Sequence, residues 1–333
     1  MRWEFWPWQV VYLPVAILWF FLALKARGWV FFSAANPCMK FGGLIAYSKV
    51  EMGTLVPENY LPRTISVSIS DTITEVETQL NEADMSFPLI IKPDMGERGK
   101  GVKILRNSSD FSRALENRKE QLMIQTYVDL PIEMGIMYSR HPSEVNGKIT
   151  SIVIKEFPFV VGDGKSTLSQ LILSNLRTRL SYKVHFRRFA DRLHTVPSIG
   201  EEIRIVTIGN HMLGTTFNNG NHLISLELEG AFDSLAKQIP GFFIGRFDIR
   251  ASSMAALLKG NFKVIEVNGV NSEPCHIYDP GMGLVSGISE LLTHWKRIYQ
   301  ISIANHQNGV EYSSFSEIRS EIKRHNRESA KHD

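Results

Sequence analysis

The sequence of 333 residues contains only two cysteines, Cys38 and Cys275. One pair cannot form a disulfide framework in a chain of this size, and such sparing use of cysteine is typical of a reducing compartment. The chain also lacks an excess of one charge, because 37 Lys and Arg residues stand against 34 Asp and Glu residues, for a formal net charge of +3. This balance argues against nucleic acid as a partner.

What the sequence does contain is enough apolar material for a core, with 44% hydrophobic and 21% charged residues. The length suits a two-lobed enzyme or two modest domains. Predicted strands often follow one another directly, which favours an α+β fold over a doubly wound parallel sheet. Helices are expected at 71–83, 110–115, 166–181 and 284–301, and strands at 89–92, 102–105, 122–128, 150–157, 202–208, 222–228, 243–250 and 262–267.

Residues 5–24 form an uncharged run in which Gln9 is the one strongly polar side chain. A helix of this length rises about 30 Å, which matches the hydrocarbon thickness of a bilayer. Tryptophans lie near both ends of the run, as they do at membrane interfaces. Because Lys25, Arg27 and Lys40 follow the run, we predict membrane association with the bulk of the chain on the cytoplasmic side.

This hydrophobic run allows more than one placement. Pro7 and Pro14 weaken a straight spanning helix, so a helix that lies in the membrane interface is the second interpretation, and a buried core helix is the third. A cleaved signal peptide is disfavoured, since the run opens with aromatic residues and lacks a small-residue cleavage site.

Residues 87–105 read FPLIIKPDMGERGKGVKIL, a strand that ends in Lys92, a glycine-rich stretch and a second strand. Glycines allow a backbone to approach phosphate oxygens, and nearby basic residues add positive charge. A plain hairpin turn explains the pattern about as well. It is not a P-loop, because GxxxxGK[ST] is absent and a strand follows. The glycines and basic residues of the stretch are Gly96, Arg98, Gly99, Lys100 and Gly101.

A second motif pairs GRFDIR at 245–250 with FKVIEVN at 262–268. Residues i and i+2 of a strand face the same way, so Glu266 and Asn268 project together, and Asp248 on the neighbouring strand can join them. Three oxygen ligands of this kind suit Mg²⁺ better than zinc. A solvated strand face is the alternative, but unpaired carboxylates inside such apolar runs are costly.

Taken in order, these motifs resemble the ATP-grasp superfamily over about residues 64–300, and most closely its carboxylate–amine ligases, such as D-alanine–D-alanine ligase. GRFD and IEVN are similar to the Arg-x-Asp and Glu-x-Asn signatures of that group. The run KEFPFVVGDGKSTLSQLI at 155–172 is similar to a segment of cyanophycin synthetase. The resemblance implies an α+β fold of two lobes with ATP between them, here preceded by the N-terminal hydrophobic helix.

The resemblance also implies roles for single residues. Lys92 would contact the nucleotide phosphates, and the loop at 95–101 would close over them. Arg246 would stabilise negative charge that develops at the reacting carbon. The stretch IQTYVDLPIE would form the adenine hinge, and Mg²⁺ (with Mn²⁺ as the alternative) would bind nearby. The hinge residues are Gln125 for the adenine amino group, Tyr127 and Val128 for backbone contacts and Glu133 for the ribose, and the metal ligands are Asp248, Glu266 and Asn268.

Three further segments carry weaker signals. Arg204 lies in an apolar strand and is expected to face the phosphates. Residues 177–194 are strongly basic, as a solvated surface or a lid would be. Residues 33–49 are either a linker or a loop that presents a lipid-like substrate. No histidine pair has metal-site spacing, and Cys275 is interpreted as a spectator.

The resulting prediction is an ATP-dependent carboxylate–amine or carboxylate–thiol ligase at the cytoplasmic membrane face. It would act on small-molecule or lipid-linked substrates through an acyl phosphate and would release ADP and phosphate. An ATP-dependent phosphotransferase and a non-catalytic, membrane-tethered nucleotide-binding module are the alternatives. The expected segments are a membrane-associated helix at 1–25, a linker or reduced pre-grasp segment at 26–63, an N-terminal lobe at 64–124, a catalytic lobe at 125–310 and a polar tail at 311–333.

Overall fold

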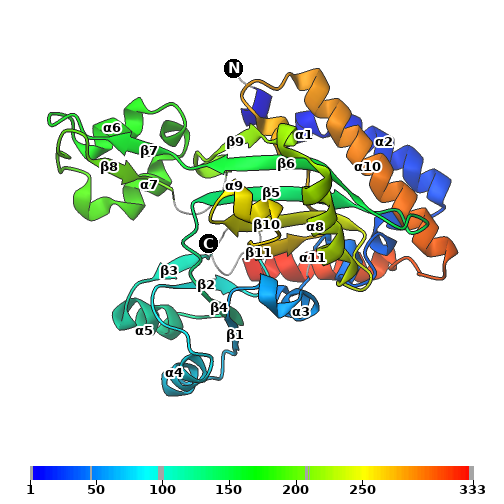
Figure 1. Ribbon diagram of the computed structural model, residues 1–333, viewed down its shortest axis with the longest axis horizontal. Helices are drawn as coiled ribbons and strands as arrows, with labels where there is room; N and C mark the ends of the chain where they lie inside the picture. Colours follow the sequence, from blue (N-terminus) through cyan, green and yellow to red (C-terminus); the bar gives the residue numbers. More distant parts are fainter. Residues whose placement is uncertain (1–2, 46, 97–100, 207–208, 210, 330–333) are drawn as a thin grey trace.

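Antiparallel strand pairing organises the chain into three sheets. The computed structural model describes residues 3–45, 47–96, 101–206, 209 and 211–329. A four-stranded sheet and a five-stranded sheet form two separate lobes, and a small two-stranded sheet projects to one side (Figure 1). The predicted α+β class is therefore confirmed, with helices packed on sheets in each lobe.

The first lobe is the four-stranded sheet with two helices on it. Its core brings Val76 and Leu80 of one helix and Phe111 and Leu115 of the other against the sheet. The first helix begins at a capping box in which Thr72 and Glu75 bond to each other's backbone N–H groups. The strands in sheet order are β1 (Thr64–Val67), β4 (Leu122–Thr126), β2 (Leu89–Pro93) and β3 (Lys103–Leu105), and the helices are α4 (Ile73–Glu82) and α5 (Ser108–Glu116).

The second lobe is the five-stranded sheet, whose two faces differ sharply in chemistry. Phe247 and Ile249 point to one face, where they pack against Phe232 and Leu235 of a covering helix. The opposite face carries charged side chains, as the period of two along a strand requires. In sheet order the strands are β11 (Lys263–Asn268), β10 (Ile244–Ala251), β5 (Ile132–Ser139), β6 (Lys148–Glu156) and β9 (Thr216–Asn219), and the neighbouring helices are α8 (Leu226–Lys237) and α9 (Met254–Leu258).

The strand predicted at 222–228 is wrong. A short turn, η8 (Asn221–Leu223), is followed by the start of α8. The alternation Leu-Glu-Leu-Glu suggests a strand, but the side chain of Ser225 accepts the backbone N–H of Leu228 and begins a helix. Strands β5 and β9 are absent from the predicted set, although β5 is the centre of the second sheet.

The third sheet belongs to a small module that extends from β6, at the left of Figure 1. Val160, Leu168, Ile172 and Ile203 form its own core. The helix predicted at 166–181 ends early, and the basic residues 177–194 lie on short helices. The elements are β7 (Phe159–Val161), β8 (Glu202–Arg204), α6 (Leu168–Ser174), η5 (Thr178–Ser181), α7 (Tyr182–Arg188) and η6 (Ala190–Arg192).

The prediction of one spanning helix over residues 5–24 is wrong. Among the described residues, no helix combines the length and the apolar character needed to cross a membrane. The run divides into η1 (Trp3–Phe5), α1 (Trp8–Val11) and α2 (Leu13–Ala26). A 14-residue helix rises only about 21 Å. Val15 and Ala23 of α2 are buried in the protein, and α2 packs beside the long helix α10 (Leu284–Gln307) (Figure 1).

Short helices fill the remaining connections. The segment after α2 contains three buried aromatic residues, Phe31, Phe32 and Phe41, which pack against α10 and β10. Near the end of the chain, Ile318 packs into the same core. The elements are η2 (Phe31–Ala34), η3 (Lys40–Gly43), α3 (Lys49–Leu55), η4 (Glu58–Tyr60), η7 (His211–Leu213), η9 (Cys275–Tyr278) and α11 (Phe315–Ser329).

A single buried amide joins this segment to β10. Asn36 donates from Nδ2 to the carbonyl oxygens of Gly42 at 3.1 Å and Ile244 at 2.7 Å. Its Oδ1 accepts the backbone N–H groups of Phe243 at 2.9 Å and Ile244 at 3.0 Å. The Asn36 amide therefore fixes the beginning of β10 against the segment that follows α2.

Replacing Asn36 by alanine should lower the free energy of unfolding by about 2–4 kcal/mol, because buried backbone groups would lose their partners. Urea denaturation of the full chain measures this change. The exposed Asn81 supplies the control, and Asn81→Ala should change the unfolding free energy by less than about 0.5 kcal/mol. Equal effects of the two substitutions would contradict the assigned role of Asn36.

Candidate active site between the two lobes

A cavity of about 420 Å³ lies where the two lobes meet, and the N-terminal segment closes part of it. Both lobes contribute charged side chains to its lining. Lys49 and Lys155, which the sequence analysis did not single out, also line it. Ten residues predicted for the site line this one cavity: Lys92, Gly96, Gln125, Tyr127, Val128, Glu133, Arg246, Asp248, Glu266 and Asn268.

Strand register accounts for the centre of the site. Arg246 pairs with Asn268 across β10 and β11, and Asp248 pairs with Glu266, so all four side chains lie on the cleft face of the sheet. On the other side of β10, Gly135 of β5 is opposite Asp248. A Cβ atom at Gly135 would lie 2.9 Å from Cδ of Arg246 and 3.1 Å from Oδ1 of Asp248, so this glycine leaves room for both side chains.

Asp248 is a buried carboxylate held by three groups. Arg246 donates from Nε to Oδ1 at 3.0 Å and from Nη2 to Oδ2 at 3.1 Å. Lys155 lies 3.2 Å from Oδ1, and Nδ2 of Asn268 donates to Oδ2 at 3.3 Å. Burial by itself would raise the pKa of Asp248, but Arg246 and Lys155 outweigh burial and lower it. The carboxylate is therefore ionised at neutral pH.

The charge alternation continues along the sheet to Glu133. Its Oε2 accepts hydrogen bonds from Nη2 of Arg250 at 2.6 Å and from Nε at 2.9 Å. Its Oε1 lies 3.3 Å from Nζ of Lys155. Burial favours neutral Lys155, yet Asp248 and Glu133 raise its pKa. Arg250, Glu133, Lys155, Asp248 and Arg246 thus form one row of alternating charges, in which Glu133 already has two cationic partners.

The predicted metal ligands have a donor set that fits a hard cation. Asp248 and Glu266 supply carboxylate oxygens and Asn268 an amide oxygen, as Mg²⁺ or Mn²⁺ prefers. The hydroxyl of Tyr47 donates to Oδ1 of Asn268 at 2.9 Å, which fixes the orientation of the amide. In the described parts of the chain no group of three or more His, Cys, Asp or Glu side chains is placed to hold a metal, so the set depends on this amide.

Lys92 reaches the same centre from the first lobe. Its Nζ donates to Oε1 of Gln125 and to the carbonyl oxygen of Ile265, both at 3.2 Å. Burial is the main cause that lowers the pKa of Lys92, to about 8, while Glu266 acts in the opposite direction. Gln125 also donates to Oγ1 of Thr64 at 3.0 Å, so its amide is engaged within the protein.

Lys49 connects the start of α3 to the base of the glycine-rich loop. Its Nζ donates to the carbonyl oxygen of Gly96 at 2.5 Å and lies 3.8 Å from Oε1 of Glu266. The neighbouring Ser48 donates to Oδ1 of Asp94 at 2.8 Å. In the sequence this lysine is a lone basic residue far from both motifs, so only the fold reveals its position.

Of the remaining predicted residues, some line the cavity and others do not. Tyr127 donates its N–H to the carbonyl oxygen of Pro88 at 3.2 Å, and the carbonyl oxygen of Val128 accepts from Arg250 at 2.7 Å. Arg204 does not line the cavity. Its guanidinium lies 3.9 Å from the ring centroid of Phe157. Gly101 lies at the end of the loop, outside the lining, and Arg98, Gly99 and Lys100 lie outside the described residues.

Cys275 lies closer to the centre than the sequence suggested. Nη1 of Arg246 donates to its Sγ at 3.1 Å. Burial raises the pKa of Cys275 to about 11, although Arg246 opposes the change. The side chain is therefore a neutral thiol at physiological pH, which suits a contact that positions Arg246 and does not suit a nucleophile.

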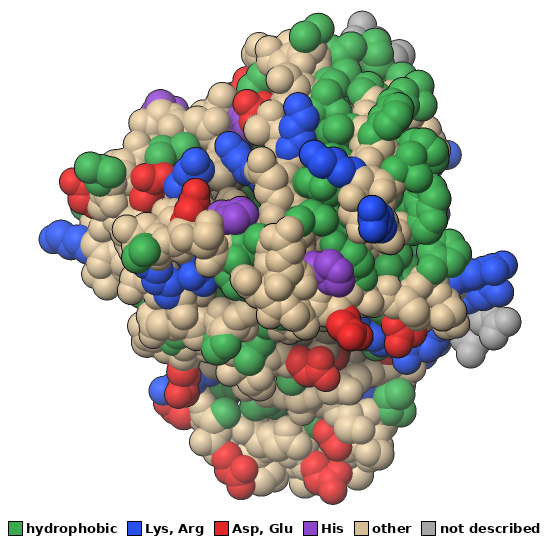
Figure 2. Space-filling model, turned by 90° about the vertical axis from the view of Figure 1, so that its right-hand side faces the viewer, with side chains coloured by type: hydrophobic (Ala, Val, Ile, Leu, Met, Phe, Trp, Pro, Cys, Tyr) green, Lys and Arg blue, Asp and Glu red, His purple; other side chains and the backbone are tan. Residues whose placement is uncertain are grey.

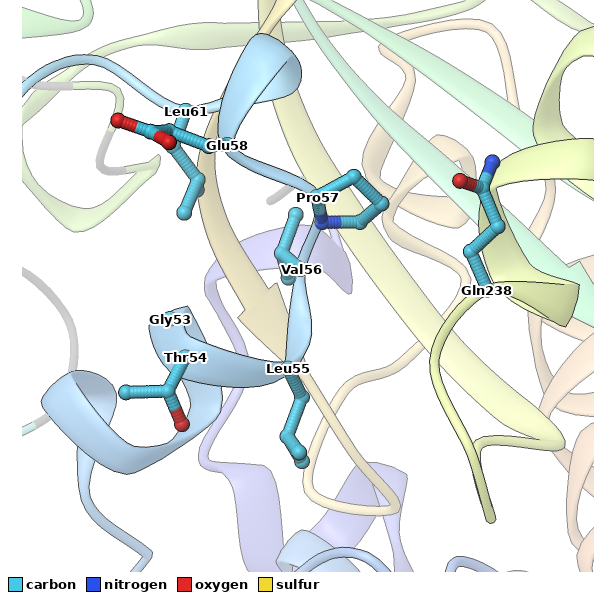
Figure 3. Close-up of a pocket in the computed structure, with 8 residues that line it drawn as sticks. All are labelled: Gly53, Thr54, Leu55, Val56, Pro57, Glu58, Leu61 and Gln238. Atoms are coloured by element: carbon cyan, nitrogen blue, oxygen red, sulfur yellow. The ribbon is translucent and has the colours of Figure 1, made fainter.

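A second hollow, of about 610 Å³, lies between α3, η4 and the end of α8 (Figure 3). Glu58 is its one ionisable lining residue, and none of the predicted site residues borders it. Figure 3 shows Gln238 across a gap from Val56 and Pro57, with no convergent set of polar groups. We therefore assign the chemistry to the cavity between the lobes.

Comparison with known proteins finds a partial family match. Residues 55–134 match the tubulin-tyrosine ligase family model. Formate-dependent phosphoribosylglycinamide formyltransferase of Pseudomonas entomophila is 29% identical over 66 residues, which are 18% of this chain and 17% of that protein.

Similar solved structures include D-alanine–D-alanine ligase of Coxiella burnetii, with 10% identity, a TM-score of 0.45 and coverage of 81% of this chain and 61% of that one. The VanG D-Ala:D-Ser ligase of Enterococcus faecalis has 13% identity, a TM-score of 0.42 and coverage of 74% and 61%. A bifunctional glutathione synthetase of Pasteurella multocida has 15% identity, a TM-score of 0.37 and coverage of 77% and 38%.

The family match over residues 55–134, the two lobes and the paired Arg-x-Asp and Glu-x-Asn strands resemble the ATP-grasp superfamily. The predicted resemblance is thereby confirmed. The chain spans about a sixth of the length of the curated relative that it matches.

The pKa of Lys92 predicts how nucleotide binding depends on pH. Phosphate groups raise the pKa of a nearby lysine, so binding above pH 8 must take up a proton. Affinity for a non-hydrolysable ATP analogue with Mg²⁺ should fall as pH rises above 8, by up to about tenfold per unit. Calorimetry between pH 7 and 9.5 measures this. Lys92→Arg should remove the slope, and the exposed control Lys183→Arg should keep it. A slope unchanged in Lys92→Arg would contradict the assignment.

Proposed function

We propose that this chain is an ATP-dependent ligase that joins a carboxylate to an amine, or to a thiol, through an acyl phosphate. The observation that carries the proposal is the arrangement at one cleft. Asp248, Glu266 and Asn268 line the same cavity as three lysines, from two lobes and the segment before them. Such a cavity can hold a nucleoside triphosphate and its cation beside a positively charged reaction centre.

The lysines would bind the phosphates. Lys92 approaches from the first lobe and Lys155 from the second, while Lys49 lies at the base of the glycine-rich loop. Their charges neutralise the oxygens that repel an incoming carboxylate. Gln125, Tyr127, Val128 and Glu133 would surround the adenosine, which requires that Glu133 exchange one of its present cationic partners for ribose hydroxyls.

Asp248, Glu266 and Asn268 would hold Mg²⁺ or Mn²⁺. Such a cation, when bound, screens the phosphate charge and orients the terminal phosphoryl group. Arg246 now bonds to Asp248, so it would turn part of its guanidinium from Asp248 to the reacting carboxylate. Tyr47 would keep the Asn268 amide oriented throughout.

The reaction would proceed in two steps. First, a carboxylate oxygen of the substrate attacks the terminal phosphorus of ATP, the bond to the bridging oxygen breaks, and ADP leaves. Then the amine nitrogen attacks the acyl carbon, the carbon–oxygen bond to phosphate breaks, and phosphate departs with the electron pair while the nitrogen loses a proton. Arg246 would bind the carboxylate in the first step and stabilise the negative charge that develops on the acyl oxygen in the second. Closure of the lobes would keep water from the acyl phosphate.

Glu266→Gln should lower the rate of ADP release by at least about 100-fold, because a metal ligand loses its charge, while the unfolding free energy stays nearly unchanged. The assay uses pooled carboxylates and amines with mass detection of products. Glu58→Gln, in the hollow of Figure 3, is the matched control and should retain full activity. Equal turnover in wild type and Glu266→Gln would refute the metal assignment, and a stable phosphorylated product without an amide would favour the phosphotransferase.

We also propose that α2 docks on a lipid surface without crossing it. Leu13, Ile17, Phe21 and Leu24 are exposed at intervals of three or four residues, so they share one helix face. Figure 2 shows a hydrophobic band along the upper right of the molecule, with basic side chains next to it. The exposed Lys25 adjoins this face. Apolar side chains beside cations are the composition that anionic lipid attracts.

Vesicles of phosphatidylglycerol and phosphatidylcholine should co-sediment with the full chain. Ile17→Ser combined with Phe21→Ser should weaken this binding at least tenfold, since two large apolar side chains would no longer enter the lipid. Val145→Ser with Ile199→Ser, two exposed apolar residues outside α2, is the control. Absence of vesicle binding would contradict the proposal, as would a dimer that the α2 variant disrupts and that binds no lipid.

A further inference from the structure

The N-terminal segment, residues 3–12, forms one wall of the cavity. Trp6, Trp8, Val11 and Tyr12 line the cavity together with the residues of the reaction centre. The helical run is interrupted at Tyr12, where α1 ends and α2 begins. The wall is therefore part of the site and distinct from the exposed face of α2.

Specific polar contacts hold the segment in place. Nε1 of Trp3 donates to the carbonyl oxygen of Met282 at 2.8 Å. A carboxylate oxygen of Glu4 lies 3.0 Å from Nε2 of His211. The hydroxyl of Tyr12 donates to Glu273. These contacts join the segment to three separate parts of the second lobe.

The chemistry of this end of the cavity is mainly apolar. Trp6 and Trp8 remain 37% and 65% exposed, although large aromatic side chains are usually covered. Met212 and Phe217 line the same cavity. An apolar ligand here would cover surface that the protein itself leaves open to water.

One carboxylate stands out at this end. Glu273 lines the cavity and accepts a hydrogen bond from Tyr12 of the wall, and Cys275, two residues later, contacts Arg246 of the reaction centre. Burial and the Glu273 charge raise the pKa of Tyr12, which keeps its hydroxyl protonated and fixed on Glu273. The other carboxylate of the wall, Glu4, is paired with His211 and Arg177.

We propose that the acceptor is an amine with an apolar chain or aromatic group. Its ammonium binds Glu273, and its apolar part lies against Trp6, Trp8 and Val11. The inference rests on the proposed ligase function and names the substrate class. The bound ammonium gives one proton to Glu273, its nitrogen attacks the acyl carbon, and the second proton leaves with the departing phosphate as the carbon–oxygen bond breaks.

Calorimetry on the full chain, with Mg²⁺ and a non-hydrolysable ATP analogue, tests the two parts separately. The probes are hexylamine, ethylamine and 1-hexanol. Hexylamine should bind at least tenfold more tightly than ethylamine, because each buried methylene contributes roughly fourfold. It should also bind at least tenfold more tightly than 1-hexanol, which has the same chain without the charge.

Two variants assign each preference to its residues. Trp6→Ala with Trp8→Ala should reduce the hexylamine-to-ethylamine ratio at least fivefold. Glu273→Gln should remove the preference for hexylamine over 1-hexanol and leave 1-hexanol binding unchanged. Phe315→Ala, an exposed aromatic residue on α11, is the matched control and should preserve both ratios.

Equal affinities for hexylamine and ethylamine would contradict the proposal that the wall binds the apolar chain. An unchanged preference over 1-hexanol in Glu273→Gln would overturn the ammonium site. The nucleotide analogue is titrated alone in the same series. If the nucleotide analogue fails to bind while hexylamine keeps both preferences, the amine site is supported and the ligase function is contradicted. If the analogue binds and hexylamine shows neither preference, only the assignment of an apolar amine as the acceptor is contradicted.

Discussion

The buried carboxylate of Asp248 is the constraint on which the site depends. An isolated charge at this depth would be costly, so the fold must supply partners from several strands. Arg246 comes from the same strand, Asn268 from β11 and Lys155 from β6. Their convergence fixes the order and register of the five-stranded sheet around the reaction centre. Removal of either cation would leave the buried carboxylate with only one charged partner.

The ion pairs of this network also bear on the proposed function. Five side chains alternate in charge from Arg250 to Arg246, so each carboxylate of the row is paired with cations before a nucleotide enters. Binding of a metal and phosphates would then exchange partners among groups that are already desolvated. The neutral thiol of Cys275 fits this arrangement, because it accepts a hydrogen bond from Arg246 without adding a charge.

Local patterns in the sequence predicted the centre of the site, because the period of two along β10 and β11 places Asp248, Glu266 and Asn268 on one face. Lys49 and Lys155 could not be found in this way, since their positions depend on pairing between distant segments. The hydrophobic run was misjudged for a related reason. Hydropathy counts apolar residues but does not reveal that Val11, Val15 and Ala23 are buried in the protein.

The first lobe has a consequence for motion. Its entry strand β1 and its last strand β4 pair directly, with Thr64 opposite Gln125. The chain therefore enters and leaves the lobe side by side, while Asn36 anchors the preceding segment firmly to β10. Under the proposed function, rotation of the lobe about this pair of connections would widen the cleft least beside Gln125 and most at the opposite end, so a nucleotide would leave with its phosphates first.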